Sequence, residues 1–557
     1  MIPLNPEPKN EKNYLLALVL SMVVMLGYPF VLKLLYPPAQ NVAKSTDSEP
    51  STPEAGTPHG EYLRAKKPQP ISSEPLVEPE IVRFENELYE AEFSTRGGSV
   101  TRLVYKGDAG RQQVTRNVLF EGVPFEPGLL TLRISQEPVD LSRAIFRVLD
   151  GSENRDEIIF QFEKPGQFRI TKHFVLSHSE PIISLDVAIE NLASETRQIP
   201  LEFDAGIHAD HLLHQQNPHE FSIVAWNGKA VTADMKHVSK KGFHLSENVA
   251  WAGVVKKYFA ILLKPEWKTV AVEGRSEDPI LWSTLLMEPL SVKAGETVRK
   301  EIFVYAGPQR YETLASFNVG FENMLSRGFF GPLKILFLKA LKASHRFTHN
   351  FGWDIILLTL ILKLLFAPFT HMSYKSMEKM KAIQPKLKSL QERYKNDPAR
   401  LNKEMMELYK RNRVNPMGGC LPMVLQIPIF IAFYQVLNEA IELKGAPFIG
   451  WIHNLAEPDR LFMFPFSLPV VGDSFNLLPL FMIASMVVQQ KMTPQSGVSP
   501  EQQKVFAFMP LVFGFIFYNM PSGLVLYWFL NNVLSIIQQG FVKRIVVTLH
   551  HEDRHSD

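Results

Sequence analysis

The sequence predicts a polytopic α-helical membrane protein that carries a large all-β domain outside the membrane. Three observations support this fold class. Apolar runs long enough to cross a bilayer as helices lie mostly after residue 320. Short runs with alternating apolar positions fill much of the region before it, and the loop charges alternate as expected for successive crossings. The mean hydropathy of the whole chain, −0.04, conceals this division.

Composition excludes several function classes. A net charge of +2 over 557 residues predicts no general affinity for polyanions, and the single cysteine, Cys420, excludes an intramolecular disulfide. His208, His211 and His214 lie close in sequence, but no second motif supports a metal or acid–base site, so we interpret them as surface loop histidines. The β-region has no phosphate loop, nucleophile elbow or metal-ligand spacing, so no enzyme and no cofactor are predicted.

The N-terminal region predicts a membrane anchor followed by a linker. Residues 1–13 are polar and are expected in the cytoplasm. The apolar run 14–36 exceeds a usual signal-peptide core and no cleavage site follows it, so it predicts an uncleaved signal anchor and first span. Residues 37–80 are rich in Pro, Ser, Glu and Thr, which predicts a disordered linker.

Residues 81–320 predict a large β-sandwich. Turn residues such as Arg96-Gly97-Gly98 separate short alternating runs. In 183–191 every second residue is apolar, and 168–176 follows a similar pattern. This period of two indicates strands with one buried face.

In residues 329–348 the apolar residues no longer alternate with a period of two. Their spacing predicts an amphipathic helix instead. Lys334, Lys339, Lys342 and Arg346 fall in one sector of the helical wheel, opposite leucines and phenylalanines. A helix that is this apolar and also carries four bases on one side is expected to lie in the membrane interface. Its basic face would then be turned toward anionic phospholipids. A buried helix of a globular domain is the alternative.

Residues 353–371, WDIILLTLILKLLFAPFTH, predict the second span, and Lys363 lies near its middle. A charge at that depth costs roughly 2.5–3.5 kcal/mol on insertion scales, so it is expected to face protein or water. We therefore predict a polar cavity around Lys363. The alternatives are a side chain that reaches a membrane surface or pairs with a buried carboxylate.

Residues 375–413 predict a cytoplasmic coiled-coil hairpin. Twelve basic and five acidic residues leave a net charge of +7, which places the segment inside by the positive-inside rule. Apolar residues recur at spacings of three and four on both sides of Asp397-Pro398. The basic surface suits RNA, anionic lipid or an acidic partner, unless it only sets topology. Its candidate residues are Lys379, Lys386, Lys388, Arg393, Lys403 and Arg411.

Four more spans complete a predicted count of six, with both termini inside. They are expected at residues 418–437, 475–490, 505–520 and 524–543. The loop 438–474 is acidic on balance, as expected outside, whereas the loop 491–504 and the tail 544–557 are expected inside. Polar residues within the spans, Thr359, Gln426 and Asn531 among them, need partners or water, which favours a hydrated groove.

Several sequence blocks are similar to the YidC membrane-protein insertase family, which is related to the Oxa and Alb proteins of organelles. The blocks lie in the family's order, and the arrangement of anchor, β-domain and core spans resembles its six-span Gram-negative form. They are NPMGGCLPMVLQIPIF (415–430), PFIGWIHNL (447–455), QQKMT (489–493), MP (509–510) and PSGLVLYW (521–528).

The resemblance implies a β-supersandwich similar to sugar mutarotases and a groove open to cytoplasm and lipid. Lys363 occupies the position of a groove charge that is usually arginine. The other groove residues implied are Thr359, Gln426, Tyr527, Trp528 and Asn531. The third-span face that would touch nascent chains contains Ile427, Pro428 and Phe430.

The implied function is insertion of nascent transmembrane segments into the bacterial inner membrane, alone or with the Sec translocon, with assistance to their folding. The ribosome and signal-recognition machinery are the further partners implied. The hydrated groove would attract acidic tails, and short spans would thin the bilayer. A small-anion transporter or channel is the alternative, although no internal repeats are visible.

Overall fold

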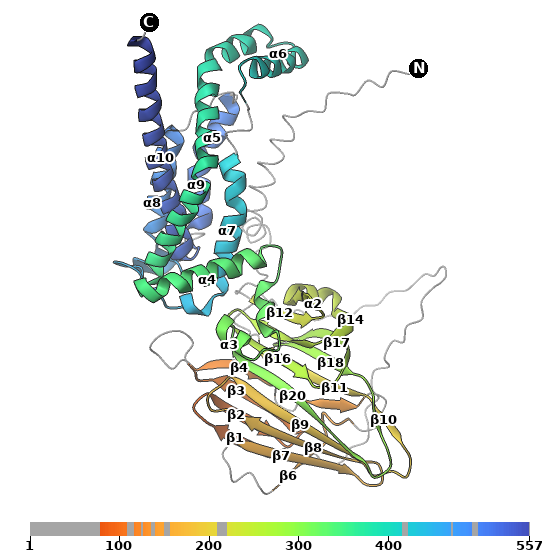
Figure 1. The fold of residues 1–557 in the computed structure, drawn as a ribbon. Helices are drawn as coiled ribbons and strands as arrows, with labels where there is room; N and C mark the ends of the chain where they lie inside the picture. Colours follow the sequence, from red (N-terminus) through yellow and green to blue (C-terminus); the bar gives the residue numbers. More distant parts are fainter. Residues whose placement is uncertain are drawn as a thin grey trace, which may run out of the picture. The chain divides into compact units, whose positions relative to one another are not determined.

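The computed structural model in Figure 1 describes most of the chain after residue 77. The predicted cytoplasmic N-terminus, first span and nearly all of the linker therefore lie outside the described residues, as do His211, His214 and Cys420. The described ranges are 78–107, 116–123, 126–134, 140–149, 156–208, 220–414, 421–468, 472–492 and 500–555.

The largest sheet of the β-domain has nine antiparallel strands in the order β13-β12-β15-β16-β20-β9-β8-β7-β6. Their bounds are β6 (Arg147–Val148), β7 (Glu157–Lys164), β8 (Phe168–Leu176), β9 (Ile182–Asn191), β12 (Phe221–Trp226), β13 (Ala230–Asp234), β15 (Trp251–Lys256), β16 (Phe259–Pro265) and β20 (Thr297–Pro308).

A five-stranded sheet, β14-β17-β18-β11-β5, packs against the nine-stranded sheet through β11, β15 and β18. Its strands are β5 (Leu132–Ile134), β11 (Leu201–His208), β14 (Phe243–Val249), β17 (Thr269–Glu277) and β18 (Ile280–Met287). A four-stranded sheet contains β1 (Ile81–Glu85), β2 (Tyr89–Ser94), β3 (Ser99–Tyr105) and β4 (Asn117–Glu121), and β10 (Arg197–Ile199) pairs with β19 (Leu290–Val292).

Short helices cover the other face of the nine-stranded sheet. Helix α3 (Tyr311–Ser316) and the 3-10 helix η3 (Phe321–Ser326) pack Leu314 and Phe321 on Trp251 and Tyr305. Helix α2 (Met235–Lys241) follows β13. Strands β12, β15 and β16 of this sheet are therefore buried on both faces.

The predicted alternation in the β-domain is confirmed. Strand β9 buries Ile183, Leu185, Val187 and Ile189, and β8 buries every second residue from Phe168 to Leu176. This burial joins both strands to one continuous apolar core. The buried face of β8 also includes one charged residue, Lys172, which has no exposed surface.

Backbone carbonyls surround the buried Lys172 ammonium. Its Nζ donates to the carbonyl oxygens of Gly97 (3.2 Å), Gly98 (2.6 Å) and Leu130 (2.7 Å). The ring of Phe174 lies 5.2 Å away. Burial lowers the pKa of Lys172 from 10.5 to about 7. The amine thus joins β8 to the turns at Gly97 and Leu130.

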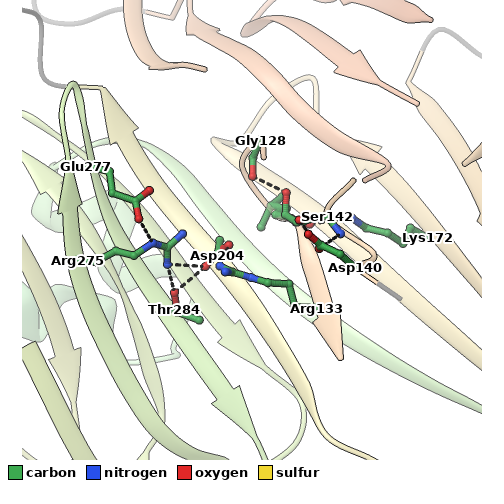
Figure 2. Close-up of polar contacts among 11 residues, drawn as sticks. Gly128, Arg133, Asp140, Ser142, Lys172, Asp204, Arg275, Glu277 and Thr284 are labelled. Carbon is green, nitrogen blue, oxygen red and sulfur yellow. Dashed lines mark hydrogen bonds and ion pairs between the residues drawn. The ribbon is translucent and has the colours of Figure 1, made fainter. Parts of the chain in front are cut away.

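Asp204 on β11 is a second buried charge (Figure 2). It lies close to the turn at Leu130. Two guanidinium groups converge on its carboxylate, those of Arg133 and of Arg275, the latter at 3.2 Å. The Thr284 hydroxyl also donates to it, at 2.6 Å. The Leu130 backbone N–H donates to the Asp204 carbonyl oxygen, so the Leu130 turn is held from both sides.

The remaining described residues are mainly helical. The helices are α4 (Gly331–Thr348), α5 (Phe351–Arg393), α6 (Pro398–Arg411), α7 (Leu421–Glu439), η5 (Ile441–Leu443), α8 (Leu478–Met492), α9 (Pro500–Phe517) and α10 (Ser522–His555). A ribbon of β21 (Phe462–Leu468) and β22 (Gly472–Phe475) precedes α8. Figure 1 shows α4 lying across one end of the longer helices.

Helix α5 is continuous where the sequence analysis placed a boundary between a span (353–371) and a hairpin (375–413). It begins at an Asn350 cap and passes through Pro368 and Pro385 without ending. Each proline removes only one helical hydrogen bond, and the flanking Met, Lys, Ala and Leu residues favour helix. After a turn, α6 packs back on α5 through Ile383, Leu387 and Tyr409.

The predicted basic face of α4 toward lipid headgroups is wrong for Lys334 and Lys342, which have acidic partners within the protein, whereas Lys339 and Arg346 are exposed. Lys334 is buried and lies 2.8 Å from Glu439, Lys342 pairs with Glu312 and Glu442, and Lys339 lies over the ring of Tyr311. Acidic partners distant in sequence, which the helical wheel does not include, cause the difference. The exposed apolar side chains of α4 and its N-terminal flank are Phe329, Leu336 and Phe347.

Glu439 at the end of α7 connects two segments, because it also accepts from Arg327 at 3.1 Å. Burial alone would raise the pKa of Glu439, yet Arg327 and Lys334 lower it. Burial lowers the pKa of Lys334, and Glu439 opposes that change. The three groups thus depend on one another for their charged forms.

We predict that Glu439→Gln destabilises the protein by about 3 kcal/mol, because it leaves the buried Lys334 charge uncompensated. Chemical unfolding in detergent micelles, followed by tryptophan fluorescence, measures the effect. Glu407→Gln is the control: its pair with Arg411 is exposed, so its removal should change stability by less than about 1 kcal/mol. Equal effects for the two variants would contradict the prediction.

We also predict that the β-domain gains stability as pH rises from about 7 to 9.5. In that window the unfolded chain retains a proton on Lys172 that the folded chain has lost, so stability rises by up to about 1.4 kcal/mol per pH unit. Below pH 7 Lys172 is protonated in both the folded and the unfolded chain, so it no longer makes stability depend on pH. Urea unfolding of the wild type and Lys172→Met checks this: the difference between their stabilities should change with pH. Parallel curves would mean that the three carbonyls keep the pKa of Lys172 near its ordinary value.

Candidate polar site between two apolar helices

Lys363 of α5 is held by neutral groups of α10. Its Nζ donates to Ser535 Oγ (2.6 Å), Asn531 Oδ1 (3.0 Å) and the Asn531 carbonyl oxygen (3.3 Å). No carboxylate among the described residues forms an ion pair with it. All three ammonium hydrogens can therefore be satisfied while the positive charge stays uncompensated, which excludes the alternative of a buried salt bridge within the described part of the chain.

More polar side chains continue between the same two helices. Thr370 Oγ1 accepts from Gln538 Nε2 at 2.8 Å. The Tyr374 hydroxyl lies near the side chains of Gln539 and Ser535. The two helices thus share a polar row that begins at Lys363 and runs toward the α5–α6 hairpin.

The sequence analysis missed Thr370, Tyr374, Ser535 and Gln539 as members of this row. A signal was present in their spacing. On α5 the polar positions are 363, 370 and 374, and on α10 they are 531, 535, 538 and 539. Within each set, every position lies three, four or seven residues from another member of the set. Such spacings place the side chains on one face of a helix.

Of the other predicted groove residues, none that the structure describes forms a hydrogen bond with Lys363. Thr359 is buried, and its hydroxyl donates to the Ile355 carbonyl of its own helix at 2.6 Å. The Tyr527 ring stacks on that of Phe433, with 4.7 Å between the ring centroids, and the Tyr527 hydroxyl lies near the Gln426 side chain. The structure therefore brings Asn531 to Lys363 and leaves Gln426 and Tyr527 in a separate group.

Trp528 lies in an aromatic cluster rather than beside Lys363. The distance between ring centroids is 5.3 Å to Phe430, 5.6 Å to Phe513 and 5.1 Å to Phe517. Phe430 from the predicted substrate-contacting face thus packs partly inside the bundle. Ile427 and Pro428 of that face are half-buried.

The α5–α6 hairpin presents its bases to solvent. All six candidate residues are exposed: Lys379, Lys386, Lys388, Arg393, Lys403 and Arg411. The apolar residues between the two helices are buried together. In the parts of the chain that are described, no group of His, Cys, Asp and Glu is arranged to hold a metal ion.

Among the helices of the described residues, α5 is long and apolar enough to cross a membrane, and 506–517 of α9 is a shorter apolar segment. A large all-β domain followed by these helices fits the predicted class, a polytopic α-helical membrane protein with an all-β domain outside the membrane. Comparison with known proteins gives the family.

The family model of the 60Kd inner membrane protein matches residues 343–549, and that of the YidC periplasmic domain matches residues 81–364. The membrane protein insertase YidC of Geobacter metallireducens is 33% identical over 555 residues, which cover 96% of this chain and 99% of that relative. The YidC of Syntrophobacter fumaroxidans is 34% identical over 559 residues, 96% of this chain and 100% of the relative. The chain belongs to the YidC membrane protein insertase family.

Solved structures are similar to the chain at lower identity. A crystal structure of an active YidC insertase with its first transmembrane domain resolved covers 82% of this chain and 93% of its own, at 19% identity and a TM-score of 0.35. A putative aldose 1-epimerase from Escherichia coli K12 covers 41% of this chain and 99% of its own, at 10% identity and a TM-score of 0.30.

Proposed function

We propose that this chain is a membrane protein insertase that moves nascent transmembrane segments into the inner membrane along the polar row between α5 and α10. The observation that carries the proposal is the uncompensated ammonium of Lys363, held by Asn531 and Ser535 within an apolar helix. Membership of the YidC family supports it.

The neutral partners of Lys363 suit a transient site for acidic groups. An internal carboxylate would neutralise the ammonium and compete with substrate, whereas an amide and a hydroxyl are weaker acceptors for a cation. An acidic residue in a translocating tail can displace Asn531 Oδ1 and leave again. Water and the polar row would solvate the tail, which hydrocarbon would not.

Insertion along this route needs no catalytic residue, nucleotide or cofactor. The apolar part of the substrate leaves the row for lipid, and its own transfer from water to hydrocarbon drives the step. Phe430, Ile427 and Pro428 of α7 are the side chains that we assign to the path of the leaving segment. We therefore propose a non-enzymatic protein.

We propose six spans with both termini in the cytoplasm: residues 14–36, 353–371, 418–437, 475–490, 505–520 and 524–543. The exposed bases of the α5–α6 hairpin favour a cytoplasmic position for it under the positive-inside rule, and the β-domain would then be periplasmic. The hairpin is also the surface that we assign to the ribosome, targeting factors and anionic phospholipids. Cooperation with the Sec translocon is part of the proposal.

The test is insertion of a small substrate with an acidic external tail into proteoliposomes that contain the purified protein. Lys363→Ala should lower insertion by tenfold or more, because the positive charge is lost, whereas Lys363→Arg should retain most activity. A substrate with a neutral tail is the matched control and should distinguish the variants little. Protease protection of the tail measures insertion.

Equal insertion by all three proteins would show that the polar row suffices without the charge. Failure of the wild type in a well-folded preparation would contradict stand-alone insertion and favour a Sec-dependent chaperone. Electrical or tracer flux of a small anion without substrate protein would favour the transporter alternative.

A further inference from the structure

A ribbon of phenylalanines precedes α8. Strands β21 and β22 pair antiparallel, with Phe462 opposite Phe475. Because side chains alternate along a strand, Phe462, Phe464 and Phe466 share one face with Phe475. Their rings form a continuous row: 4.9 Å between Phe475 and Phe462, 5.3 Å between Phe462 and Phe464, and 5.6 Å between Phe464 and Phe466.

Among the described residues, none covers this row fully. Phe466 is 56% exposed, Phe462 49% and Met463 on the opposite face 61%. The sequence from Leu461 to Gly472 contains no charged residue and a single hydroxyl. A two-stranded ribbon is marginal in water, so one with this much exposed aromatic surface requires a cover.

The base of the ribbon is fixed to helix ends. Asp459 Oδ2 accepts from the backbone N–H groups of Leu477 and Leu478, both at 2.9 Å, where α8 begins. Asn476 Nδ2 donates to the carbonyl oxygen of Tyr518 at 2.7 Å, just after α9 ends. The ribbon therefore lies at the level at which these two helices begin and end.

In the proposed topology that level is the periplasmic boundary of the bilayer, and the inference rests on this part of the proposed function. Trp451, which donates to Asp459 Oδ2 at 2.7 Å, and Tyr518 lie at the same level, and these residue types concentrate at membrane interfaces. Leu480 and Phe481, in the first turn of α8 after the ribbon, are also exposed apolar side chains.

We propose that the phenylalanine face of the β21–β22 ribbon inserts into the periplasmic leaflet of the bilayer, at the boundary between headgroups and acyl chains. Lipid fits better than a protein partner, because the face offers flat apolar area and almost no hydrogen-bonding group that would select one protein surface. Its position beside the lipid-facing start of α8 supplies the acyl chains directly.

Spin labelling of the full chain in liposomes of phosphatidylethanolamine and phosphatidylglycerol tests this. Cys420→Ser removes the native thiol, and Phe466→Cys receives the label. Ser291→Cys, exposed on β19, is the water reference, and Leu511→Cys, exposed on α9, is the lipid reference. Accessibility to oxygen relative to a water-soluble nickel complex should be at least threefold higher at 466 than at 291. A label at Phe462 repeats the measurement should the first variant fold poorly.

A ratio at 466 equal to that at 291 overturns the inference. Low accessibility to both reagents also overturns it, because a protein would then cover the ribbon. A water-like label at 511 would overturn the proposed spans and this inference together, whereas a lipid-like label at 511 with a water-like label at 466 overturns the inference alone. With the label at 466, Phe464→Glu should lower the ratio toward the water value, and Phe464→Leu should not.

Discussion

The hydrogen bonds that join Lys363 to Asn531 and Ser535 are the interaction on which the arrangement of the helices depends. An ammonium within an apolar helix needs acceptors, and the nearest ones lie on α10. This requirement fixes which faces of α5 and α10 meet. Thr370 and Tyr374 of α5 then find Gln538 and Gln539 of α10 along the same seam. The need of one ammonium for acceptors thus accounts for the polar row and for its position relative to the hairpin.

Three lysines of the protein have three different kinds of hydrogen-bond acceptor. Lys363 has neutral side-chain acceptors, Lys172 has only backbone carbonyls, and Lys334 has a carboxylate. The last two are structural, since carbonyls of fixed turns and a paired Glu439 hold the chain in place. Lys363 alone has side-chain acceptors that carry no charge, and these are the weak partners that the proposed function assigns to replacement by acidic groups of a substrate.

Much of the fold could be predicted from the sequence, because periodicity reports burial directly. The alternation in β8 and β9 and the apolar spacing in the α5–α6 hairpin predicted buried faces that the structure contains. Contacts between distant segments could not be predicted in this way. The helical wheel placed the bases of α4 on one side but contained no information on Glu439 or Glu442. Similarly, Lys363 was visible in sequence, but its partner Ser535 was one small polar residue among many.

The continuity of α5 has a mechanical consequence. Its 43 residues form a rod of about 65 Å, with Lys363 near one third of its length and the hairpin at its far end. Since no loop interrupts the backbone between them, tilting the hairpin would shift the face of α5 that meets α10. In the proposed function, a partner that binds the hairpin would thereby lengthen or shorten the hydrogen bonds around the Lys363 ammonium.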